Sequence, residues 1–111
     1  MAVKNPQEPF SRITVSEAKS MLDNGDAVLI DVREPHEYAE DHAAGATLIP
    51  LNSVWARQSE LPEDKDLLMI CKSGQRSALA SEYAAAAGRT RLFNVEGGTD
   101  SWRSSGLPME K

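Results

Sequence analysis

The chain has 111 residues, 41% of them hydrophobic and 26% charged, which is enough to bury the core of one soluble globular domain. Its formal net charge of -5 argues against nucleic acid or an anionic membrane surface as the main partner. Its apolar runs are short, far below the roughly 20 residues that a membrane-spanning helix requires.

The N-terminal third predicts a lead-in, a short strand, a helix and a central strand. Residues 1–10 are polar, contain prolines and lack the apolar segment of a signal peptide, so we expect a flexible lead-in. The alternation over 13–15 predicts an edge strand, and Thr14 with Glu17 forms a capping-box pattern that starts a helix. Residues 27–32 form a continuous apolar run, which is typical of a central parallel strand buried on both faces.

The middle of the chain continues the alternation of strands and helices. Pro35 suits the first turn of a second helix. Residues 47–49 predict a short strand, and residues 52–60 predict a helix. Residues 67–70 are the second strongly apolar strand, and residues 77–87 have the best helix propensity in the chain.

The C-terminal segment adds one strand and one helix. Residues 92–95 predict the strand, Thr99 or Asp100 is expected to cap the helix, and Gly106 to stop it. Strands alternate with helices along the whole chain. This order predicts an α/β fold in which helices cover both faces of a parallel sheet.

Cys71 is the sole cysteine, and it lies where an apolar strand meets a glycine-bearing polar turn. A lone cysteine excludes an intramolecular disulfide and is typical of a reducing compartment, so we expect a cytoplasmic protein. The N–H groups of such a loop, together with a helix N-terminus, lower the pKa of a thiol. Because the thiolate is the nucleophile, the position of Cys71 predicts nucleophilic chemistry.

Three motifs in series resemble a rhodanese domain. Residues 31–38 and 42–51 are similar to its N-terminal half, residues 71–80 to its active-site loop and following helix, and residues 95–108 to its closing segment. The chain departs from the family pattern at Asp41 and at Ala43-Ala44, which we expect to form a surface turn.

The resemblance implies a five-stranded parallel sheet flanked by helices, in a single rhodanese domain over residues 11–109. It also implies a sulfurtransferase in which Cys71 carries a persulfide. The N–H groups of residues 72–77 are candidates to stabilise its charge. Gly74 allows a positive φ, Ser73 and Ser77 offer hydroxyl groups, and Lys72 and Arg76 would attract an anionic donor. The expected site is therefore Cys71 with Lys72, Ser73, Gly74, Gln75, Arg76 and Ser77.

Loop length separates this chemistry from its nearest alternative. Enzymes that resemble tyrosine phosphatases place five residues between the cysteine and an arginine, so that the loop wraps a phosphate. Only Lys72, Ser73, Gly74 and Gln75 separate Cys71 from Arg76 here. The shorter loop favours a single sulfur atom over a phosphoryl group.

The roles of some polar residues stay open at this point. Arg76 either binds substrate or pairs with a carboxylate. Asp31 either supports the site with Arg33 or is a structural carboxylate that pairs with it. His36 and His42 are spaced six residues apart, which does not place both on one helical face, so we expect no metal. His42 is expected to anchor a turn.

The leading hypothesis is an enzyme without a cofactor, acting on a small anionic sulfur donor such as thiosulfate or polysulfide. A thiol, cyanide or a protein would accept the sulfur, and no nucleic acid or membrane is involved. One alternative is a relay module that passes the persulfide sulfur to a partner protein. Another is a non-catalytic interaction domain with the same fold.

Overall fold

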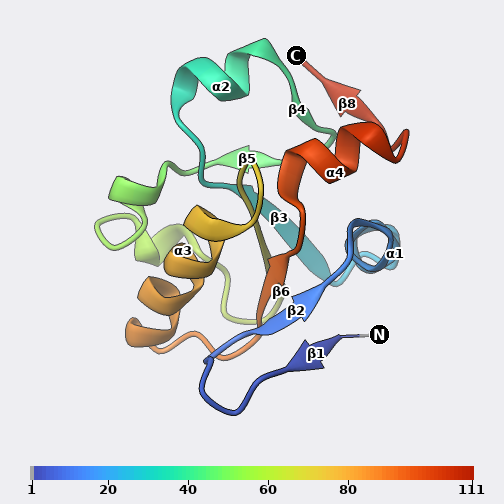
Figure 1. The fold of residues 1–111 in the computed structure, drawn as a ribbon. Coiled ribbons are helices and arrows are strands. Elements are labelled where there is room, and N and C mark those ends of the chain that lie inside the picture. The colour runs from blue at the N-terminus through green and yellow to red at the C-terminus, as the bar shows by residue number, and fades with distance from the viewer. Residues whose placement is uncertain (1) are drawn as a thin grey trace.

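A six-stranded sheet forms the centre of the protein, shown here by a computed structural model that describes residues 2–111 (Figure 1). Five strands run parallel, and β1 pairs antiparallel with β2 at one edge. In spatial order the strands are β1 (Val3–Lys4), β2 (Ser11–Ile13), β7 (Leu92–Val95), β6 (Asp66–Ile70), β3 (Ala27–Asp31) and β5 (Thr47–Leu48). The α/β fold with five parallel strands is thus confirmed, with one antiparallel strand added.

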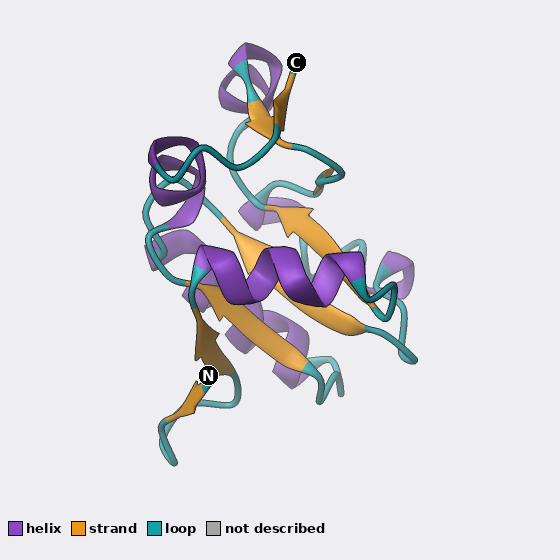
Figure 2. Ribbon diagram, turned by 90° about the vertical axis from the view of Figure 1, so that its right-hand side faces the viewer, coloured by secondary structure: helices purple, strands orange, loops and turns teal. Residues whose placement is uncertain are grey.

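Helices cover both faces of the sheet. The helices are α1 (Val15–Asp23), α2 (Pro35–Glu40), α3 (Gln75–Ala86) and α4 (Gly98–Ser104). Figure 1 places α3 on one side of the sheet and α1 with α4 on the other, and in Figure 2 α1 lies across the front of the strands. A small second sheet pairs β4 (His42–Ala43) with β8 (Met109–Glu110). No helix within residues 2–111 is long and apolar enough to cross a membrane.

The core has two halves because the central strands are apolar on both faces. Leu67 and Met69 of β6 pack in the cluster that contains Ala80 and Ala84 of α3. The alternate residues of the same strand, Leu68 and Ile70, pack in the cluster under α1 and α4. The continuous apolar run therefore gave the correct prediction of a strand buried on both faces.

The N-terminal region differs from its prediction. Val3–Lys4 pairs with β2, and Phe10 is buried, so the expected lead-in contains ordered pairing and one core residue. The strand predicted over 13–15 lies over 11–13 instead, and it is not an edge strand, because β2 lies between β1 and β7. Val15 is already helical, since the capping box of Thr14 and Glu17 starts α1 there.

The helix predicted over 52–60 is wrong. The segment forms two 3₁₀ turns, Leu51–Ser53 and Gln58–Glu60, joined by further turns. Val54 is buried whereas Trp55 is exposed. The segment therefore packs single residues into the core and lacks the continuous apolar face of an amphipathic helix. The expected surface turn at Ala43 is also wrong, because Ala43 is fully buried in β4.

Candidate active site

Cys71 follows β6 directly and lies at the carboxyl edge of the sheet, where open α/β folds place their ligand sites. Only 1% of its surface is exposed. Its sulfur accepts a hydrogen bond from the Gly74 N–H at 3.1 Å and lies 3.3 Å from the Ser77 hydroxyl oxygen. The structure therefore places polar hydrogens around a buried sulfur atom.

The surroundings of Cys71 favour its thiolate. Burial alone raises the pKa of the thiol, because the charged form loses water. The Ser77 hydroxyl and the N–H groups of Ser77, Gly74 and Ser73 oppose this effect. The net result is a Cys71 pKa below its ordinary value, as the loop pattern predicted.

Gly74 gives the loop its shape. Its φ of +112° is a conformation that side-chain-bearing residues rarely adopt, and it is the N-cap of α3. The helix consequently begins at Gln75, two residues before the predicted start at Ser77. Ser77 is not a cap: it is a fully buried residue of the first turn, and its hydroxyl lies between Cys71 and Asn94.

The N-terminus of α4 holds the other side of the loop. Thr99 donates to the Cys71 carbonyl from its N–H at 2.8 Å and from its hydroxyl at 3.0 Å, and the Asp100 N–H donates to Lys72 O at 3.1 Å. Gly97 rather than Thr99 or Asp100 is the N-cap, so the predicted cap was wrong. The Thr99 side chain binds the loop of Cys71 instead of its own helix.

Both cations of the loop are already paired with carboxylates. Lys72 is exposed and its Nζ lies 2.8 Å from Asp100. Arg76 binds Glu37 of α2 through two hydrogen bonds of 2.7 and 3.0 Å. The Arg76 guanidinium lowers the pKa of Glu37 to about 2, against the effect of burial. Of the two roles considered for Arg76, the structure shows the carboxylate pair.

Asp31 and Arg33 form a buried ion pair at the end of β3. The guanidinium contacts the carboxylate at 2.9 to 3.1 Å, and the Arg33 N–H donates to the same carboxylate at 2.9 Å. Arg33 also donates to Asp41 O at 2.7 Å. These bonds match the structural role considered for Asp31. The ion pair stabilises the segment that follows β3, beside the site.

A charged cavity of about 280 Å³ opens beside the loop. Ser73 and Gln75 are exposed at the turn, whereas Arg33 and Lys72 line this cavity. Its remaining lining residues are Glu37, Glu40, Asp41, Asp100 and Arg103. Cations and carboxylates are mixed around it, so the cavity is not a uniformly positive anion site.

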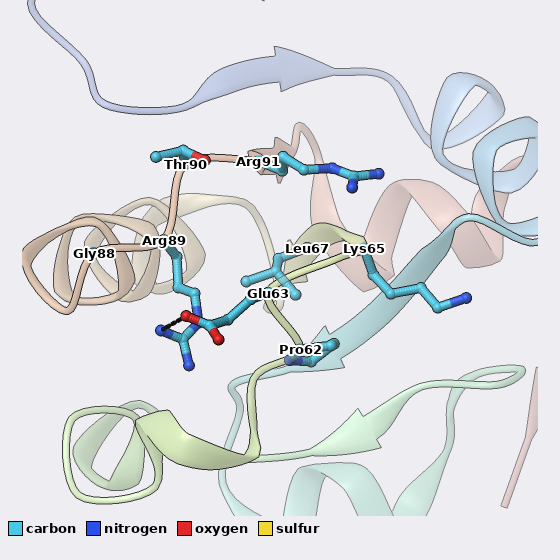
Figure 3. A pocket seen from close by; sticks show the side chains of 8 residues that line it. All are labelled: Pro62, Glu63, Lys65, Leu67, Gly88, Arg89, Thr90 and Arg91. Atoms are coloured by element: carbon cyan, nitrogen blue, oxygen red, sulfur yellow. Dashed lines mark ion pairs between the residues drawn. The ribbon is translucent and has the colours of Figure 1, made fainter.

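Another cavity, of about 220 Å³, lies at the opposite edge of the sheet, before β6 and β7 (Figure 3). Its cations have partners: Arg91 pairs with Asp66 and Asp26, and Arg89 donates to the carbonyls of Gln58 and Leu61. None of the residues that line it is a cysteine or histidine. It is therefore separate from the site of Cys71.

His42 packs against α2. His42 stacks on Tyr38 with ring centroids 3.6 Å apart, and its Nδ1 lies 2.8 Å from Tyr38 O. These contacts join β4 to α2. Within residues 2–111, no group of three or more His, Cys, Asp or Glu side chains is placed to bind a metal ion.

The sequence interpretation missed Asn94 and Glu37. Asn94 accepts from Ser77 at 2.5 Å and is fully buried in β7. An asparagine inside an apolar strand was a detectable signal, because asparagine is depleted in strands and rarely buried. Glu37 carried no such signal, since its partner Arg76 is far away in the chain.

Comparisons with known proteins agree with the fold. Residues 14–105 match the rhodanese-like domain family. A sulfurtransferase of Allochromatium vinosum is 35% identical over 83% of this chain and 86% of its own length. The thiosulfate sulfurtransferase GlpE of Actinobacillus pleuropneumoniae is 30% identical over 93% of this chain and 95% of its own.

A solved structure shows the same fold. The rhodanese-related protein of Thermoplasma volcanium superimposes with a TM-score of 0.81 at 30% identity, covering 89% of this chain and 96% of that one. The matches span nearly the full length of these small proteins, as the three motifs in series predicted. The chain belongs to the family of single-domain rhodanese-like sulfurtransferases.

Proposed function

We propose that this protein transfers the outer sulfur of thiosulfate to a thiophilic acceptor through a persulfide on Cys71. The observation that carries the proposal is the position of the buried Cys71 sulfur at the carboxyl end of β6. This sulfur accepts a hydrogen bond from the Gly74 N–H and lies beside the Ser77 hydroxyl. Thiosulfate is the donor named for the GlpE relative.

The proposed reaction has two displacement steps. The Cys71 thiolate attacks the outer sulfur of thiosulfate, so that a new S–S bond forms, the S–S bond of thiosulfate breaks, and sulfite leaves with the electron pair. An acceptor such as cyanide then attacks the outer sulfur of the persulfide. Thiocyanate leaves, and the Cys71 thiolate is regenerated without any net oxidation of the protein.

The loop supports the intermediate through its amides. A persulfide places its outer sulfur about 2 Å beyond Sγ, among the N–H groups that already face Cys71. The N–H groups of Ser73, Gly74 and Ser77 act on the charge of Sγ directly. Lys72, Ser73 and Gln75 are exposed at the rim, where they are the groups that an incoming donor or acceptor meets.

One observation favours a second candidate, the sulfur-relay module. Lys72 and Arg76 are paired with Asp100 and Glu37, so their pull on a small dianion is largely cancelled. A partner protein with its own contacts would not depend on that pull. In this candidate Cys71 still forms the persulfide, but a protein receives the sulfur.

The deciding experiment is intact-mass measurement after incubation with thiosulfate, and again after addition of cyanide. Wild type is expected to gain one sulfur atom and lose it to cyanide, whereas Cys71→Ser gains none. Ser105→Ala, which removes an exposed hydroxyl at the end of α4, is the matched control and should behave as wild type.

The outcomes separate the candidates. Sulfur transfer that persists in Cys71→Ser would refute the proposal. Loading of Cys71 with slow turnover of thiosulfate and cyanide would favour the relay module. No loading from thiosulfate or from polysulfide would instead favour the non-catalytic interaction domain.

A further inference from the structure

The hydroxyl of Ser77 has two neighbours that can accept its single proton. Its oxygen lies 2.5 Å from Asn94 Oδ1 and 3.3 Å from the Cys71 sulfur. Ser77 and Asn94 are both fully buried, so water does not supply a replacement proton. The hydroxyl can donate to only one of the two acceptors at a time.

The orientation of the Asn94 amide is fixed by its other contacts. Its Nδ2 donates to Gly74 O at 3.0 Å and to Glu96 Oε2 at 2.7 Å, and both of these atoms are acceptors. Arg12 holds the other carboxylate oxygen of Glu96 at 2.9 Å. The amide nitrogen must therefore face Gly74 and Glu96, which leaves Oδ1 facing Ser77.

The direction of the Ser77 proton then depends on the state of Cys71. When Cys71 is a thiol, its S–H can donate to the Ser77 oxygen while Ser77 donates to Asn94. When Cys71 is a thiolate, the sulfur has only lone pairs, and its stabilisation by Ser77 requires the Ser77 proton to turn away from Asn94. Ionisation of Cys71 thus breaks the bond between Ser77 and Asn94.

We propose that Asn94 is a positioning residue that competes with the Cys71 sulfur for the Ser77 proton and so sets how readily the thiol ionises. It touches neither substrate nor the reacting sulfur, and it acts through Ser77. The inference rests on the proposed function, because the ionisation of Cys71 that Asn94 controls matters only if Cys71 carries the sulfur. While the Ser77 hydroxyl donates to Asn94, the thiol form of Cys71 is favoured. The thiolate is favoured when the hydroxyl donates to the sulfur instead.

Other charged groups also face this part of the site. Arg76 interacts electrostatically with Cys71 from α3 and is paired with Glu37 of α2. The buried pair of Asp31 and Arg33 lies at the end of β3. The pair of Lys72 and Asp100 joins the loop to α4. The bonds of these groups do not include Asn94, so substitution of Asn94 leaves their partners in place.

The test is a double-mutant cycle on the ionisation of Cys71. The ultraviolet absorbance of the thiolate is followed against pH, and it reports one site because the chain has one cysteine. Asn94→Leu removes the competing acceptor, so at a pH below the pKa the thiolate-to-thiol ratio is expected to rise about fivefold, as for one hydrogen bond. In the Ser77→Ala background, the same substitution is expected to change the ratio little.

The Ser77→Ala background is also the matched control. The double variant loses the same Asn94 contacts to Gly74 and Glu96 as Asn94→Leu alone. A purely structural effect of Asn94→Leu would therefore appear equally in the wild-type and Ser77→Ala backgrounds. Equal changes in the two backgrounds, or a lowered thiolate fraction in Asn94→Leu, would overturn the proposal.

A second measurement uses the wild-type chain and does not depend on whether Asn94→Leu folds. The carbon-13 resonance of the Asn94 side-chain carbonyl is expected to move with the same midpoint as the ionisation of Cys71, and to move less in Ser77→Ala. A resonance that ignores this ionisation would refute the role of Asn94. Neither measurement uses a sulfur donor, so failure of sulfur transfer leaves the result interpretable.

Discussion

Gly98 allows α4 to lie directly against the carbonyl groups of the Cys71 loop, and Gly98→Ala tests that contact. A Cβ at this position would lie 2.5 Å from both Cys71 O and Lys72 O. The φ of Gly98 is +58°, in the left-handed region that alanine adopts only at a cost. The substitution therefore adds a backbone clash to a backbone strain.

The magnitude follows from these two effects. The left-handed conformation costs about 1 to 2 kcal/mol for alanine, and the clash forces a backbone shift that adds about 1 to 3 kcal/mol. We expect a loss of about 3 kcal/mol in the free energy of unfolding, which lowers Tm by roughly 15 °C in a domain of this size. Because the loop must move, the hydrogen bonds from Thr99 to Cys71 O are expected to weaken as well.

Gly25→Ala is the matched control. Gly25 has a similar positive φ of +84°, but a Cβ there would have nothing within 4 Å. Gly25→Ala should lower the free energy of unfolding by only about 1 kcal/mol and load sulfur at the wild-type rate. The assay is denaturant unfolding of both variants, followed by intact mass after thiosulfate. Equal losses of stability in Gly98→Ala and Gly25→Ala would refute the argument from close approach.

Two further predictions concern the ion pairs of the loop. Arg76 lowers the pKa of Glu37 from 4.5 to about 2, so the pair stabilises the fold fully above pH 4.5 and loses this effect as the pH falls toward 2. Glu37→Gln should therefore lower the free energy of unfolding by about 1 to 2 kcal/mol at neutral pH, after allowance for the partly exposed Arg76. Denaturant unfolding checks this: a stability difference between wild type and Glu37→Gln that persists near pH 2 would contradict it. Lys72→Ala should change the free energy of unfolding by less than about 0.5 kcal/mol, because the pair with Asp100 is exposed. It should slow loading by thiosulfate about two- to fivefold at low salt, and a slowing that high salt does not reduce would contradict the electrostatic reason.

The sequence predicted the sheet well because its central strands are uniform. Residues 27–30 and 67–70 are apolar at consecutive positions, which is typical of a strand buried on both faces. Short elements were harder to predict. The segment 52–60 has helix-forming residues, but only Val54 and Leu61 around it are buried, and tertiary packing rather than propensity decides such a segment.

The geometry of the candidate site was predictable where its contacts are local. Cys71, Gly74 and Ser77 are within one loop and one helical turn, so the strand, the glycine and the helix start were sufficient to place them. The partners of the loop were not predictable in this way. Glu37 reaches Arg76 from α2, and Thr99 reaches Cys71 from α4, and only the folded sheet brings these elements together.

The pairing of the loop cations changes how the charge of the site should be understood. Lys72 and Arg76 would give the loop a positive field at long range if they were free, but Asp100 and Glu37 cancel most of that field. Amide dipoles act over a few ångströms and are not cancelled by these pairs, so they act on the sulfur itself. The stabilisation of a charged sulfur therefore comes from backbone N–H groups and Ser77, whereas the cations fix the loop between α2 and α4. We therefore propose that such a site stabilises a persulfide anion well and attracts a distant dianion weakly.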